Sequence, residues 1–134
     1  MMFEFDTLIS RSEDEAICGR FARMPVADLF CVWDCDVDSW VAGSPLLIRF
    51  EEDDLLVEVA GDHAVLTAGA VETGDASTLP ALCATAPLQA DACLCWCRCD
   101  LLDDLIGEAG AVPQLLAVLF ERATKSGLLL DEPQ

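Results

Sequence analysis

The sequence predicts an α+β domain made mainly of antiparallel strands, folded as a compact twisted sheet or a partly open small barrel with one N-terminal helix. Apolar and polar residues alternate with period two through residues 46–60, as in strands half buried against a core. Acidic and glycine-containing turns interrupt this alternation, and a helix-start pattern precedes it. A chain of 134 residues can bury a full core, so residues 1–134 are expected to form one domain.

The N-terminal region predicts one strand and one helix. Residues 1–9 alternate phenylalanine with acidic residues and are expected to add a short strand. Ser12 and Glu15 fit a capping box, in which each side chain satisfies the other's backbone N–H. The sequence therefore predicts a helix over about 13–23, which Pro25 ends.

The middle of the chain predicts strands. A first strand covers residues 26–33, and a three-strand meander follows at 46–50, 55–60 and 64–68, with turns at 51–54 and 61–63. Residues 74–91 are rich in Ala, Thr, Ser and Pro, which indicates a long surface connection. As a strand, residues 93–99 would place four cysteines on one face and Leu94, Trp96 and Arg98 on the other.

Residues 113–124 fit two structures. Pro113 at a first helical position, an apolar stripe at helical spacing and a stop at Gly127 indicate a helix. Against this, the chain contains a possible repeat. An apolar segment is followed by an aliphatic run twice, first at residues 25–32 and 43–48 and again at residues 113–120 and 126–130. A two-fold internal β repeat would explain this pattern, and it tips the prediction slightly toward a strand at 115–120.

Acidity is the strongest feature of the composition. The chain has 25 Asp and Glu against 7 Lys and Arg, a net charge of −18. Such a field repels nucleic acid and anionic membranes, so a partner attracted by charge should be a basic protein. The alternative is that the acidic residues only keep an apolar chain soluble, or that they reflect coding bias. No apolar run approaches the ~20 residues of a membrane span, and no signal pattern begins the chain, so we expect a cytoplasmic protein.

The loop after the first strand holds the residues expected to bind this partner. Asp34, Asp36 and Asp38 alternate along it, and Trp40 follows. An aromatic side chain among carboxylates suits a basic surface, because tryptophan is enriched among binding hot spots. For Trp40 itself, packing in the core or the turn is favoured over recognition. The loop lacks the glycine and glutamate that an EF-hand needs at its sixth and twelfth positions, so calcium is not expected.

Eight cysteines form the second unusual feature. Burial as small hydrophobic side chains is the simplest explanation, and disulfides are not expected in a reducing compartment. A structural zinc site is an alternative, with ligands drawn from Cys31, Cys35, Cys93, Cys95, Cys97 and Cys99. That site requires strand 26–33 to lie beside strand 92–99. Thiol redox chemistry is a further alternative, although acidic surroundings disfavour the reactive thiolate.

No catalytic constellation is visible. His63 is the one histidine and falls in a predicted turn, and the chain has no nucleophile elbow, phosphate-binding loop or H-E-x-x-H motif. We therefore expect a non-catalytic binding module without a cofactor, analogous to inhibitors or immunity-type proteins that neutralise a basic partner. The alternative is a cysteine-rich zinc-binding or thiol redox protein. The pattern specifies no oligomeric state.

Overall fold

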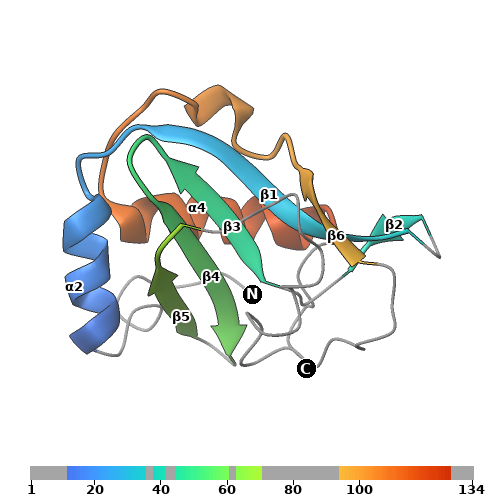
Figure 1. Ribbon diagram of the computed structural model, residues 1–134, viewed down its shortest axis with the longest axis horizontal. Helices are drawn as coiled ribbons and strands as arrows, with labels where there is room; N and C mark the ends of the chain where they lie inside the picture. The colour runs from blue at the N-terminus through green and yellow to red at the C-terminus, as the bar shows by residue number, and fades with distance from the viewer. Residues whose placement is uncertain (1–11, 36–37, 42–44, 61–62, 71–93, 128–134) are drawn as a thin grey trace.

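The computed structural model describes residues 12–35, 38–41, 45–60, 63–70 and 94–127 (Figure 1). Its elements are, in order, α2 (Ser12–Phe21), β1 (Val26–Asp34), β2 (Ser39–Trp40), β3 (Leu46–Phe50), β4 (Asp54–Ala60), β5 (His63–Ala68), β6 (Leu94–Arg98), the 3₁₀ turn η2 (Asp103–Leu105) and α4 (Val112–Lys125). Every pairing between these strands is antiparallel. The predicted α+β class with a mainly antiparallel sheet is confirmed.

The six-stranded sheet is organised around β1. Its first half pairs with β3 and its second half pairs with β6. Because β6 takes one edge of Phe30–Asp34, β2 must lie on the other edge, where it pairs with Trp33 and Asp34. The meander β3–β4–β5 extends the sheet away from β1. Among the described strands β5 and β6 therefore form the two outer edges, and the sheet is not closed into a barrel.

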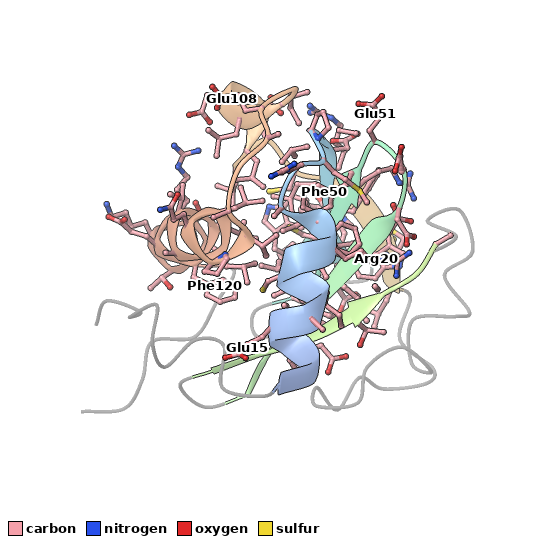
Figure 2. All side chains as sticks on the ribbon, turned by 90° about the vertical axis from the view of Figure 1, so that its left-hand side faces the viewer. Glu15, Arg20, Phe50, Glu51, Glu108 and Phe120 are labelled. Atoms are coloured by element: carbon pink, nitrogen blue, oxygen red, sulfur yellow. The ribbon has the colours of Figure 1, made fainter. Side chains whose placement is uncertain are left out.

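The two helices of the described residues, α2 and α4, cover one face of this sheet. Figure 1 shows α4 crossing behind the strands and α2 at one end of them. In Figure 2, α2 stands in front, with Phe120 of α4 to one side and Phe50 of β3 near its upper end. The rings of Phe21 and Phe50 lie 4.8 Å apart. The main core is made of buried side chains from both helices and this face, among them Leu29, Cys31, Ile48, Leu55, Val57, Leu116 and Phe120.

The opposite face of the sheet is also buried. A second cluster there consists of Val32, Leu47, Leu56, Leu94 and Trp96. The expectation of half-buried strands is therefore wrong for β3 and β4, whose aliphatic residues are buried on both faces. Burial on both sides explains why residues 46–48 are uninterruptedly aliphatic, as strands enclosed on two faces usually are.

Most predicted elements are confirmed within one or two residues. The helix over 13–23, the strand over 26–33, the meander and the cysteine-rich strand correspond to α2, β1, β3–β5 and β6. The short strand β2 was not predicted. The expected strand at 1–9 and the connection at 74–91 lie outside the described residues.

The strand predicted at 115–120 is wrong, because this segment belongs to the helix α4. Pro113 sits in its first turn, where a missing N–H is tolerated, and Gly127 follows its end with φ 81°. A helix places the apolar side chains of this run on one side, where a strand would divide them between two faces. The buried set is Val112, Leu116, Leu119, Phe120 and Ala123. The internal β repeat fails for the same reason, since its second copy starts as a helix.

Neither helix of the described part is long and apolar enough to cross a membrane.

Candidate functional site

The pairing of β1 with β6 gathers five cysteines on one face of the sheet. Cys97 lies opposite Cys31, and Cys95 lies opposite Trp33. The neighbours of these cysteines on β6, Leu94 and Trp96, pack into the second cluster on the other face. A shift of one residue would turn both onto the face where Cys95 and Cys97 are only half-buried, so their burial favours the register that turns the thiols to this side. We call Cys31, Cys35, Cys95, Cys97 and Cys99 the thiol strip.

The sulfurs of the strip lie close together. The Sγ atoms of Cys35 and Cys95 are 3.6 Å apart, and those of Cys95 and Cys97 are 3.5 Å apart. Cys31 and Cys99 share a hydrogen bond. All six described cysteines are thiols rather than halves of disulfides.

Two contacts of the strip run diagonally across the strands. Cys95 is the register partner of Trp33, so its contact with Cys35 is displaced by two residues along β1. The Cys31–Cys99 contact is displaced in the same direction, because the partner of Cys31 is Cys97. Sheet twist brings one diagonal of an antiparallel pair closer than the other, which accounts for both contacts.

Exposure changes along the strip. Cys31 and Cys99 are 0% and 5% exposed and belong to the main core. Cys97 and Cys95 are half-buried, and Cys35 is exposed. The strip therefore runs from the core to the surface, and a reagent in solution meets Cys35 first.

The buried end of the strip holds one thiol donor and one thiolate acceptor. Donation from Cys31, together with backbone hydrogen bonds from Leu101 and Asp100, lowers the pKa of Cys99 to about 7 against the opposing effect of burial. The same hydrogen bond, with burial, raises the pKa of Cys31 above its ordinary value. The pair thus shares one proton near neutral pH.

Two of the predicted partner-binding residues, Asp34 and Trp40, lie where β1 ends, but Asp34 is the register partner of Leu94, so its side chain is on the face opposite the thiol strip. Asp34 is half-buried at the end of β1, Asp38 is exposed with φ 56°, and Asp36 lies outside the described residues. Trp40 is half-buried and meets Trp33 edge to face, with ring centroids 4.9 Å apart. Of these residues the structure thus brings Trp40 near the cysteines, which the sequence treated separately, since Trp33 is also the partner of Cys95. Binding of a basic partner through these residues stays a prediction.

The ion pairs of Arg98, at the inner end of the strip, were not visible in the sequence. Arg98, the one basic residue of β6, bonds Asp28 at 2.9 Å and Asp103 at 2.6 Å. No sequence pattern signals these contacts, because they depend on how the η2 turn folds back beside β1.

The zinc alternative requires neighbouring strands and, in addition, ligand side chains gathered around one point. Strand β1 does lie beside β6, as that site needed. Among the residues that the structure describes, no three Cys, His, Asp or Glu side chains are arranged to hold a metal ion. Cys93, one of the proposed ligands, lies outside that part of the chain, so zinc binding stays a prediction.

A separate apolar pocket of about 230 Å³ lies between β1, β3 and α4. Its lining includes Met24, Phe50, Leu115 and Val118, with Glu108 and Gln114 as its polar members. It offers neither a nucleophile nor a cluster of titratable groups. The thiol strip is therefore the strongest candidate for chemistry. No protein-family model, curated protein or solved structure matches this chain.

Proposed function

We propose that this protein is a redox-responsive thiol protein in which Cys35 and Cys95 form a reversible disulfide. The observation that carries the proposal is the 3.6 Å contact between their sulfurs at the exposed end of the strip. An oxidant can reach Cys35, and its resolving thiol is already in contact. In a cytoplasm that keeps thiols reduced, such a disulfide is transient, as in redox-sensing proteins.

The chemistry requires two thiols and a hydroperoxide. The Cys35 thiolate attacks the peroxide, an S–O bond forms, the O–O bond breaks, and the departing oxygen takes a proton. The sulfur of Cys95 then attacks this sulfenic acid and expels water. The two cysteines lose two electrons and two protons, and the hydroperoxide is reduced to an alcohol, or to water for hydrogen peroxide, with a second water from the sulfenic oxygen. Thiol exchange reverses the disulfide.

The other contacts of the strip are less suited to this role. Cys95 and Cys97 lie two apart on one strand, which separates their Cα atoms by roughly 6.5–7 Å, at the limit for a disulfide. Cys31 and Cys99 are buried, so an oxidant in water does not reach them. Cys35 and Cys95 are the pair whose sulfurs are in contact and in which one cysteine is exposed to solvent.

The test is to oxidise reduced protein with one equivalent of hydrogen peroxide, block remaining thiols and digest with trypsin and an enzyme that cleaves before aspartate. Cys35 is then carried by residues 34–35, separate from Cys31, and Cys95 by residues 91–98. We expect a disulfide-linked pair of these two fragments.

Serine variants identify the second cysteine, because residues 91–98 also contain Cys93 and Cys97. The cross-link should disappear in Cys95→Ser and persist in Cys97→Ser and Cys93→Ser. Persistence in Cys95→Ser, or over-oxidation of Cys35 to sulfinic acid with no cross-link in the wild type, would overturn the proposal.

A further inference from the structure

Two neighbouring thiols at the outer end of the strip are placed as a pair of metal ligands. The sulfurs of Cys35 and Cys95 are 3.6 Å apart, and both residues are thiols rather than halves of a disulfide. Cys35 is exposed and lies one residue beyond the end of β1, whereas Cys95 is half-buried within β6. An ion from solvent therefore reaches one sulfur directly and finds the second held by the sheet.

The third thiol of this region does not join the first two around one point. Cys97 contacts Cys95, with 3.5 Å between the sulfurs, and its register partner on β1 is Cys31. Cys35 lies on the other side, two residues beyond Trp33, which is the partner of Cys95. Cys35 and Cys97 therefore approach Cys95 from opposite directions along the strands. Within the described ranges, no three Cys, His, Asp or Glu side chains surround a common metal position, which agrees with this arrangement.

Two sulfur ligands suit a narrower class of metal ion than four do. Zinc in structural sites takes four ligands in a tetrahedron. Copper(I) is a soft ion that prefers sulfur, and two thiolates in a line satisfy its coordination. With metal–thiolate bonds of about 2.3 Å, an ion in line between two sulfurs separates them by about 4.6 Å. The contact between Cys35 and Cys95 must therefore widen by about 1 Å, a change that rotation of the exposed Cys35 side chain provides.

We propose that Cys35 and Cys95 form a binding site for copper(I). The ion enters at Cys35, and Cys95 completes its coordination. Each thiol gives its proton to solvent, so two protons leave for every ion that binds, and no electron is transferred. This inference does not depend on the redox function, because binding requires no oxidation. Copper(I) and the Cys35–Cys95 disulfide exclude each other, since both use the same two sulfurs.

The test is an anaerobic competition for copper(I) between the reduced full-length protein and bathocuproine disulfonate, a chelator whose copper(I) complex is coloured. We expect the protein to withdraw a first equivalent of copper(I) when the chelator is limiting. Loss of a supporting group alone costs about 10–100-fold in metal affinity, so Cys35→Ser or Cys95→Ser should weaken this binding by ~100-fold or more. Cys97→Ser removes the neighbouring thiol and Cys18→Ser removes a buried thiol of α2, and both should keep the affinity of the wild type.

Two further measurements locate the ion. X-ray absorption of the protein with one equivalent of copper(I) should show two sulfur ligands, and N-ethylmaleimide should then fail to alkylate Cys35 and Cys95 while Cys97 still reacts. No competition with the chelator, wild-type affinity in Cys35→Ser or Cys95→Ser, or weakened binding in Cys97→Ser would overturn the inference. The disulfide is measured without metal, so this result and the result for the redox function are separate.

Discussion

At the residue scale, the cysteines of the thiol strip differ in their surroundings and in the role we propose for them. Those at the inner end pack in the core, and those at the outer end are the ones proposed to react. Cys31 is fully buried and donates to Cys99, so it acts as a core side chain with a fixed proton. Cys35, four residues on, is exposed and touches Cys95. The sequence expectation that cysteines are small buried hydrophobes therefore holds for the inner end of the strip and not for the outer end.

The Cys31–Cys99 pair predicts how stability depends on pH. Cys99 is ionised in the fold above about pH 7, whereas the unfolded chain keeps that thiol protonated until about pH 9. The unfolded state therefore binds more protons between pH 7 and 9, so the free energy of unfolding rises across this range. This added stability is lost as the pH falls through 7. The rise is roughly 2–3 kcal/mol, since one pKa unit corresponds to about 1.4 kcal/mol. Above pH 9 Cys31 reverses the trend, because its raised pKa keeps this thiol protonated in the fold after the unfolded chain has lost the proton.

Urea unfolding between pH 6 and 10 measures this dependence. Cys99→Ala should remove the rise, and Leu102→Ala, which deletes a buried neighbour without a titratable group, should lower stability by a constant amount and keep it. An equal slope in wild type and Cys99→Ala would contradict the shared-proton account.

At the scale of elements, period-two alternation was enough to place the strands of the meander. Helix and strand could not be separated at 115–120, because Leu115-Leu116-Ala117-Val118-Leu119-Phe120 is apolar throughout and fits a buried strand as well as a helix. The segment is a helix because α4 packs against the main core. These contacts join residues that are far apart in the sequence, so the local pattern does not show them. The sequence also left the pairing of β1 with β6 undecided, because it joins distant parts of the chain. Cys35 and Cys95, which are in contact, are 60 residues apart.

The role of α4 in the core gives a prediction at this scale. Leu116 is 0% exposed, so Leu116→Ala should reduce the free energy of unfolding by about 2–5 kcal/mol through lost burial and a cavity. Gln114, exposed two residues earlier, provides the control, and Gln114→Ala should change stability by less than about 0.5 kcal/mol. Equal losses, measured by urea unfolding, would contradict the packing of α4 on the sheet.

At the scale of the whole molecule, acidity acts on the stability of the fold. A net charge of −18 over 134 residues repels itself in the compact state and is screened by salt. The composition alone predicts this, but it does not predict which cysteines reach the surface or which sulfurs touch one another. That arrangement depends on the pairing of β6 with β1.

Added salt should therefore stabilise the protein. We expect the Tm to rise by several degrees as sodium chloride increases from low to physiological concentration, because self-repulsion is screened. Differential scanning calorimetry measures the change. A Tm that is constant or falls over this range would show that the ion pairs outweigh the repulsion.

The central claim is that Cys35 and Cys95 act as one two-electron redox pair. Its most direct test is an equilibrium titration of the protein in buffers of defined dithiothreitol redox ratio, followed by thiol blocking and intact-mass analysis. The account predicts that the first transition removes two thiols together, that both are Cys35 and Cys95, and that Cys35→Ser or Cys95→Ser abolishes it. A first transition that survives in either variant, or thiols that titrate one at a time, would contradict it.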